Sequence, residues 1–325
     1  MKTKILGTGS YLPPKVLTNH DISKFLDTND DWIVSRTGIK ERHIVEGETC
    51  SDLAYEASLR ALKESQVHVD DLDMIILATL TSEKRVPGTS FLLQDKLKAK
   101  KAAVYDIDVA CSGFVFGLSI ADQYIRNENQ KNILVVGTEV MSKVLDWRDR
   151  TTCILFGDGA GAAVLGPSQG DERTILSTHL FSNGSLFHLL EIPGGGTAMP
   201  WTAEGLIRGD HFVKMQGKEV YRVAVESMTQ SSQLALQKGG FTIADVDVFI
   251  PHQANLRIMD GVAKRLQIPE KKVFMNVDRV GNTSGASIAI ALDEAIHQKK
   301  IKQGDLVLLT TFGAGFAWGS ALIRW

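Results

Sequence analysis

The chain has 325 residues, of which 44% are hydrophobic and 23% are charged, values typical of a water-soluble globular protein. With 36 basic and 38 acidic residues its net charge is −2, so no bulk positive charge directs it to nucleic acid. No apolar run approaches the roughly 20 residues of a membrane helix, and the first residues lack the apolar stretch of a signal peptide.

Predicted helices and strands alternate along the chain. Continuous apolar runs typical of strands occur at residues 74–80, 132–137, 248–250 and 306–312, and strands are also predicted at 104–110, 162–166 and 273–281. Helical patterns occur at residues 51–65, 117–128, 219–239, 253–266 and 283–296. Strands without polar alternation indicate sheets that are covered on both faces, and the alternation of the two element types predicts an α/β protein.

The two halves of the chain resemble each other. The segments that start at Leu62 and Leu236 both contain the end of a helix, a short turn, an Asp-x-Asp pair and a buried strand. Two more segments, VYDIDVACSG and NILVVG, match FMNVDRVGNTSG and DLVLLT about 170 residues later in the same order. This repeat predicts two similar halves, 1–170 and 171–325, joined at the turn-rich segment 167–173. Residues 184–210 have little periodicity and are predicted to form a loop or cap.

Several familiar motifs are absent or incomplete. Gly157, Gly159 and Ala162 match a dinucleotide fingerprint, but a strand rather than a helix is predicted to follow. No spacing typical of metal ligands occurs, so we expect no metal site. The three cysteines, Cys50, Cys111 and Cys153, are odd in number and widely spaced, which favours a reducing compartment and a cytoplasmic protein.

Polar residues follow three of the predicted strands, and a predicted helix follows each of them: Cys111, His252 and Asn282. Ligands in open α/β sheets bind at such strand ends, and the repeat pairs the Asn282 turn with the Cys111 turn. A thiol at a helix N-terminus is expected to favour the thiolate, and small Ser112 and Gly113 leave room for a substrate carbonyl. His252 and Asn282 add two hydrogen-bond donors, which could complete a hydrolase triad or stabilise an enolate. The residues alone leave both roles open.

The motifs VACSGF, PHQAN and GNTSGAS resemble the active-site motifs of β-ketoacyl-acyl carrier protein synthase III, a family of thiolase-fold condensing enzymes. DDWIVSRTGIKER, FGDGAGAAVL and FGAGFAWGSALIRW match other blocks of that family, and the resemblance extends from GTGSYLPP to the last residue. It implies a homodimer whose subunits have a duplicated, thiolase-like α-β-α-β-α architecture of five layers with mixed sheets.

The resemblance also implies a reaction, the initiating condensation of type II fatty acid synthesis. Cys111 would take an acyl group from acyl-coenzyme A, with acetyl-coenzyme A as the expected donor. Decarboxylative Claisen condensation with malonyl-acyl carrier protein would then give β-ketoacyl-carrier protein, coenzyme A and CO2. His252 and Asn282 would stabilise the enolate, and the backbone N–H groups of Cys111 and Ala314 would form the oxyanion hole. Such a multifunctional acyltransferase needs no cofactor, because coenzyme A and the carrier's phosphopantetheine are substrates.

The resemblance assigns binding residues as well. The implied contacts to coenzyme A are Trp32, Arg36, Arg150, Gly217, Ala254 and Asn255. The implied contacts to the carrier protein, on the helix after His252, are Gln253, Ala254, Asn255, Leu256, Arg257, Lys264 and Arg265. Arg257 and Lys264 are seven residues apart and so share a helical face. Val86 would reach across the dimer into the partner's acyl pocket.

Two stretches depart from the commonest family pattern, the one around Val86 and LEIPGGGTAMPW at residues 190–201. The accepted acyl chain is therefore left open by the sequence. Two alternative functions remain: a secondary-metabolite condensing enzyme of the quinolone or polyketide-starter type, and a thioester hydrolase built on cysteine, histidine and asparagine.

Overall fold

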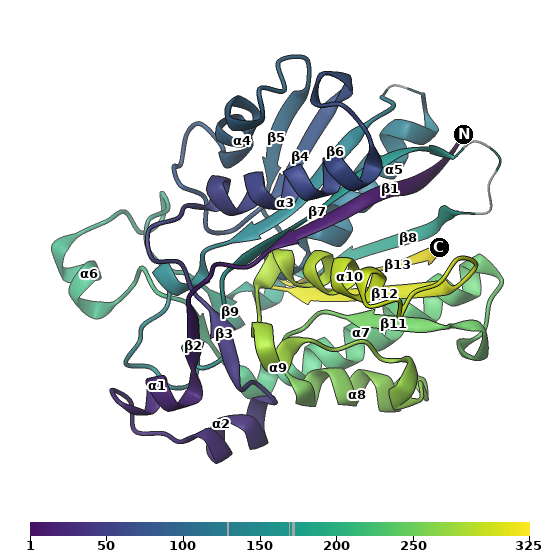
Figure 1. The fold of residues 1–325 in the computed structure, drawn as a ribbon. Coiled ribbons are helices and arrows are strands. Elements are labelled where there is room, and N and C mark those ends of the chain that lie inside the picture. Colours follow the sequence, from purple (N-terminus) through teal and green to yellow (C-terminus); the bar gives the residue numbers. More distant parts are fainter. Residues whose placement is uncertain (129, 169, 171–172) are drawn as a thin grey trace.

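Two mixed sheets form the frame of the computed structural model, which describes residues 1–128, 130–168, 170 and 173–325 (Figure 1). The first sheet consists, in spatial order, of β1 (Lys2–Tyr11), β7 (Gly159–Ser168), β6 (Ile133–Glu139), β4 (Met74–Ala78) and β5 (Ala103–Ile107). The second consists of β8 (Thr174–Ser182), β13 (Ala317–Arg324), β12 (Leu306–Gly313) and β11 (Val248–Pro251).

The second sheet repeats the order and the directions of the first. Both begin with two antiparallel pairings, β1–β7–β6 in one and β8–β13–β12 in the other, and both continue with a parallel strand, β4 or β11. The repeat of the strand segments seen in the sequence is therefore confirmed. The predicted junction at 167–173 includes residues 169, 171 and 172, which lie outside the described residues.

One predicted strand, residues 273–281, is wrong. Only Val273 forms a bridge, to Phe249 in the place that β5 occupies in the first sheet. The chain then turns into the short helix α9 (Val277–Val280). The side chain of Gln253 accepts the Asn276 N–H at 3.0 Å, and this hydrogen bond holds the chain away from the edge of the sheet.

Helices complete five layers (Figure 1). The central layer contains α5 (Gly113–Arg126) and α10 (Ser287–His297), which contact both sheets. The outer face of the first sheet is covered by α3 (Cys50–Ser65) and α4 (Thr89–Leu97), and that of the second by α7 (Gly217–Gly239) and α8 (Leu256–Leu266). The expected α-β-α-β-α architecture is thus confirmed, with the largest buried cluster between the two sheets.

Local sequence explains how these helices differ. The first eight residues of α10, SIAIALDE, include apolar residues on every side, as suits a helix buried between two sheets. By contrast, α8 buries one face and exposes its charged residues. Asn255 caps its N-terminus by accepting the Ile258 N–H at 3.0 Å, and Gln267 ends it in a left-handed conformation.

The remaining elements are short. They are β2 (Val16–Thr18), α1 (Asn19–Ser23), α2 (Asp30–Thr37), β3 (Glu41–His43), β9 (Leu190–Glu191), α6 (Ala203–Arg208) and β10 (Lys214–Met215). The predicted loop or cap at 184–210 is largely irregular and contains α6, which projects from the body of the molecule (Figure 1). Each helix within the described residues is too short or too polar to span a bilayer.

Gly161 in β7 marks the closest approach of α10 to the first sheet. A Cβ atom there would lie 2.5 Å from Ala289 Cβ and 2.7 Å from Ile290 N. We predict that Gly161→Ala lowers the free energy of unfolding by at least about 2 kcal/mol, because neither backbone has room to move. In the control Gly47→Ala the new Cβ meets nothing within 4 Å, so the change should stay below about 1 kcal/mol. Urea denaturation measures both, and equal losses would contradict this packing.

Candidate active site

Cys111 lies in the turn η2 (Ala110–Ser112), which connects the end of β5 to the central helix α5. Two hydroxyl groups tie this turn to the second sheet: Ser112 Oγ donates to Ala317 O at 2.7 Å, and Thr311 Oγ1 donates to Cys111 O at 2.9 Å. Ala110 has a φ of 46°, in the left-handed region that favours glycine. The nucleophile candidate therefore stands on a tight turn that both halves of the molecule hold in place.

His252 and Asn282 line the same cavity as Cys111, a space of about 130 Å3. His252 follows β11 directly, and Asn282 comes just before η7 (Ser284–Ala286). This turn precedes α10 as η2 precedes α5, and Ser284 has a φ of 47°, close to that of Ala110. The duplicated turns thus face each other across the central layer.

Both donors are held in defined positions. His252 is 3% exposed, and its Nδ1 lies 2.5 Å from Ser287 Oγ, so Nε2 is the nitrogen left for the cavity. Burial lowers the pKa of His252 to about 3, which keeps the imidazole neutral. Asn282 Oδ1 accepts the Ser284 N–H at 2.8 Å, which leaves its amide nitrogen for the cavity. Each residue can therefore offer an N–H group to a bound oxygen.

Burial opposes the thiolate that the helix N-terminus is expected to favour. Burial raises the pKa of the Cys111 thiol to about 12, because the sulfur has little contact with water. The thiol donates to Ser284 Oγ at 3.5 Å. Burial therefore favours the protonated thiol of Cys111 in the free protein, and the proton has to be removed during a reaction at sulfur.

Sequence reasoning missed Glu139, the last residue of β6. Its side chain is fully buried, and Oε1 accepts the Ser284 hydroxyl at 3.1 Å. Burial raises the pKa of the Glu139 carboxyl to about 7. The available signal was an acidic residue at the end of an unbroken apolar strand, but such a residue looks like an ordinary strand terminus in the sequence.

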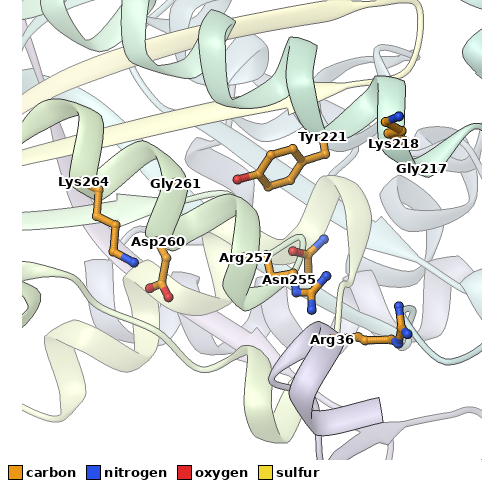
Figure 2. Close-up of a pocket in the computed structure, with 9 residues that line it drawn as sticks. All are labelled: Arg36, Gly217, Lys218, Tyr221, Asn255, Arg257, Asp260, Gly261 and Lys264. Atoms are coloured by element: carbon orange, nitrogen blue, oxygen red, sulfur yellow. The ribbon is translucent and has the colours of Figure 1, made fainter. Parts of the chain in front are cut away.

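Three cavities adjoin one another, and two of them border Cys111. The outermost, of about 710 Å3, lies between α2, α7 and α8 (Figure 2), and it is lined by Arg36, Gly217, Lys218, Tyr221, Asn255, Arg257, Asp260, Gly261 and Lys264. It shares Gly217, Tyr221 and Asn255 with the cavity that holds Cys111, His252 and Asn282. The four cationic residues of the outer cavity face a single carboxylate, so its mouth is suited to anions.

The third cavity lies beyond Cys111 and has a volume of about 250 Å3. Apolar side chains form much of its wall: Leu80, Met141, Phe156, Leu190, Ile192 and Val213. Ala314, the second residue expected at the oxyanion hole, lines it together with Cys111. A substrate arm entering from the surface would therefore meet charge first, then the buried donors and the thiol, and finally an apolar end.

Three of the residues expected to contact coenzyme A lie beside the mouth, and the resemblance implies that Trp32 and Arg150 enclose its adenine. The guanidinium groups of Arg36 and Arg150 lie over the Trp32 ring, 4.6 Å and 5.1 Å from its centroid. A base between Trp32 and Arg150 would need two stacking distances of about 3.5 Å each, so Arg150 has to move outward to admit it. Ala254 lines the neck of the channel, as Gly217 and Asn255 do.

Two of the residues expected to touch a carrier protein lie elsewhere. Gln253 is 1% exposed, and its side chain bonds to the backbone of Pro251 and Asn276, so it holds the fold instead of facing a partner. Arg265 follows Lys264 directly, and one step along a helix turns the side-chain direction by about 100°. Arg265 therefore lines a separate hollow with Phe241. Arg257 and Lys264 remain together at the mouth, whereas Leu256 packs against Gly38.

Val86 is 85% exposed and lines none of the cavities described above. A separate hollow contains Glu64, Asp293 and His297, whose potential ligand atoms lie within 4.8 Å of one another, a grouping that no sequence spacing indicated. Asp293 accepts hydrogen bonds there from the hydroxyls of Thr8 and Ser10. These hydrogen bonds give Asp293 a structural role, since they join α10 to β1.

The chain matches family models and known proteins along most of its length. Models described as 3-oxoacyl-[acyl-carrier-protein] synthase III match residues 105–184 and, for its C-terminal part, 236–325. The chain is 48% identical over 322 residues to the beta-ketoacyl-[acyl-carrier-protein] synthase III of Caldanaerobacter subterraneus, covering 99% of this chain and 97% of that one. It is 47% identical to the Aquifex aeolicus enzyme over 325 residues, covering 100% of both chains.

Solved structures agree with these matches. The crystal structure of the Aquifex aeolicus synthase superposes with a TM-score of 0.93, covering 99% of this chain and 100% of that chain. The priming β-ketosynthase of the R1128 polyketide pathway is 34% identical, with a TM-score of 0.91 over 99% of this chain and 96% of that one. Identity near one half along the full length, on the same thiolase-like fold, means that this chain belongs to the β-ketoacyl-[acyl-carrier-protein] synthase III family.

Proposed function

We propose that this chain is the initiating condensing enzyme of type II fatty acid synthesis and that Cys111 is its nucleophile. The observation that carries the proposal is the channel, in which a cationic mouth, two buried N–H donors and an apolar end meet at one thiol. Acyl-coenzyme A and malonyl-carrier protein both present a thioester on a long arm with anionic groups. The channel accommodates each part of such an arm in order.

The first half-reaction is the transfer of the acyl group to sulfur. The donor's thioester carbonyl lies beside Cys111, and the backbone N–H groups of Cys111 and Ala314 receive the developing oxyanion. The acyl chain occupies the apolar cavity, and coenzyme A leaves through the mouth. Acetyl-coenzyme A is the proposed donor, although a cavity of about 250 Å3 has room for longer chains.

The second half-reaction is decarboxylative condensation. Malonyl-carrier protein loses CO2, and His252 and Asn282 donate to the enolate oxygen that forms. The carbanion attacks the acyl group on Cys111 and releases β-ketoacyl-carrier protein. With its pKa lowered to about 3, His252 is a poor base but a ready donor, which favours this role over that of a hydrolase base.

Substrate binding follows from the residues at the mouth. Trp32 and Arg150 hold the adenine, Arg36 contacts the phosphates, and Gly217, Ala254 and Asn255 guide the arm. The acidic carrier protein docks on the exposed face of α8, where Arg257 and Lys264 supply the charge. Coenzyme A and the carrier's phosphopantetheine enter as substrates, and the proposed steps call on no metal or resident cofactor.

The proposal includes the assembly of the enzyme. Within the described residues β5 pairs only with β4, so one edge of the first sheet is left for a second copy of the chain. In that homodimer the exposed Val86 reaches the partner's acyl cavity. We further propose that 1–170 and 171–325 are its two halves, and that a multifunctional enzyme with three unpaired cysteines works in the cytoplasm.

A second candidate is the priming synthase of a secondary metabolite, because the polyketide priming enzyme shares this fold at 34% identity. The same channel serves both functions, and the acyl donor separates them. Incubation with a panel of acyl-coenzyme A donors, followed by intact mass measurement, identifies the chain that Cys111 accepts. Rapid loss of the acyl group without malonyl-carrier would instead indicate the hydrolase.

We predict that Cys111→Ala abolishes acyl transfer, because no other atom can form the covalent thioester. Intact mass after incubation with acetyl-coenzyme A should show one added acyl group on the wild type and none on the variant. Cys153→Ala is the control, since Cys153 lines none of the three channel cavities, and it should acylate normally. An acyl adduct on the Cys111 variant would exclude Cys111 as the nucleophile.

We also predict that His252→Ala and Asn282→Ala slow malonyl decarboxylation by about 10²-fold or more and acylation much less, because enolate charge exists only in the second half-reaction. Single-turnover experiments time acylation by mass and decarboxylation by CO2 release. Acylation that falls as steeply as decarboxylation would assign His252 the role of a base.

Charge reversal at the mouth tests carrier docking. Arg257→Glu should weaken the apparent affinity for malonyl-carrier about tenfold at low salt and less at high salt, because screening removes long-range attraction. The matched control is Arg265→Glu on the same helix, which faces a different hollow and should have little effect. Equal losses in the two variants would place the docking surface elsewhere.

A further inference from the structure

A continuous line of hydrogen bonds runs from the nucleophile to a buried carboxyl group. The Cys111 thiol donates to Ser284 Oγ at 3.5 Å, and the Ser284 hydroxyl donates to Glu139 Oε1 at 3.1 Å. All three side chains are buried, and the two hydrogen bonds join them directly. It joins the two duplicated turns to the end of β6.

The surroundings of Glu139 suit a group that gains and loses a proton. Every hydrogen bond that it makes within the described residues is accepted from a donor, among them the hydroxyls of Thr79 and Thr81 and the N–H of Leu80 and Gly285. These donors favour the carboxylate, whereas burial favours the acid. The titratable groups that face it are two thiols, Cys50 from α3 and Cys111 from η2. Within the described residues no cation faces Glu139 to fix its charge, so both the acid and the carboxylate form are accessible near neutral pH.

We propose that Glu139 takes the Cys111 proton through Ser284 during acylation and returns it when condensation releases the thiol. The inference rests on the proposed function of Cys111 as nucleophile. Glu139 touches neither sulfur nor substrate, so it is a positioning residue for the proton. His252 is the other nearby base, but its Nδ1 is engaged by Ser287 and burial keeps it a weak one.

The steps balance. In acylation the Cys111 sulfur forms a bond to the acyl carbon, the bond from that carbon to the sulfur of coenzyme A breaks, and the thiol proton passes through Ser284 to Glu139. The coenzyme A thiolate takes a proton from water at the mouth. In condensation the carbanion forms the new carbon–carbon bond, and the Cys111 thiolate leaves. Glu139 then returns its proton through Ser284, which restores the thiol and the carboxylate.

The test measures alkylation of Cys111 by iodoacetamide as a function of pH, with peptide mass spectrometry to separate it from Cys50 and Cys153. In the wild type the rate should rise up to about pH 7, where Glu139 ionises, and then level off. In Glu139→Gln the levelling should disappear, and at pH 8 the rate should be roughly 10²-fold lower, the usual range for loss of a general base.

Ser284→Ala breaks the line of hydrogen bonds but leaves Glu139 and its other donors. Its alkylation rate should therefore also lose the inflexion near pH 7, where the wild-type rate levels off. If Glu139→Gln does not fold, Ser284→Ala still tests the proposal. The double variant should be no slower than either single variant, because the two residues act as one unit. Glu139→Asp keeps a carboxyl group and should retain an inflexion at a reduced rate.

Asp158→Asn is the matched control. Burial raises the pKa of this carboxyl too, but its hydrogen bonds come from Val45 and Ser142, not from the Cys111 turn. The wild-type inflexion should persist in it. An inflexion that survives in Glu139→Gln or Ser284→Ala, even with slower alkylation at every pH, would overturn the proposal. Iodoacetamide needs no acyl-coenzyme A, so this outcome is distinct from failure of the proposed function.

Discussion

The burial of α5 and α10 between the two sheets is the constraint on which the site depends. Each helix begins at a tight turn, and because both helices lie in one layer the two turns are pressed together. Gly285 shows how closely: a Cβ there would lie 3.1 Å from Ala110 O and 3.0 Å from Glu139 Oε1. The contact between halves that closes the core therefore also brings a thiol, a hydroxyl and a carboxyl into one line.

Burial also sets the charges of this site. The same loss of water raises the pKa of the Cys111 thiol, lowers the pKa of the His252 imidazole and raises the pKa of the Glu139 carboxyl to about 7. Charge is concentrated instead at the surface, on Arg36, Arg257 and their neighbours. An anionic substrate is thus attracted at the mouth, while its thioester enters a region where a few N–H donors act strongly on developing charge.

Much of the fold could be predicted from sequence, because unbroken apolar runs and a repeat are strong local signals. The same signals located Cys111, His252 and Asn282 at the ends of elements. What failed depends on contacts between distant residues. Gln253 adjoins His252 in sequence yet fills the interior, where its side chain accepts the Asn276 N–H in the segment predicted as a strand. Glu139 acquires its surroundings only when the second half packs against β6.

The small cavity that holds Cys111 has a consequence for kinetics. In the proposed reaction both thioester arms enter the cavity of Cys111 past Gly217, Tyr221 and Asn255, and this cavity encloses only about 130 Å3. Two arms cannot occupy it together, so no ternary complex with both arms threaded can form. Coenzyme A has to depart before the carrier's arm arrives, which makes the geometry that of a ping-pong enzyme. An excess of either thioester then inhibits the reaction, because it occupies the entrance at the stage when the other thioester has to bind.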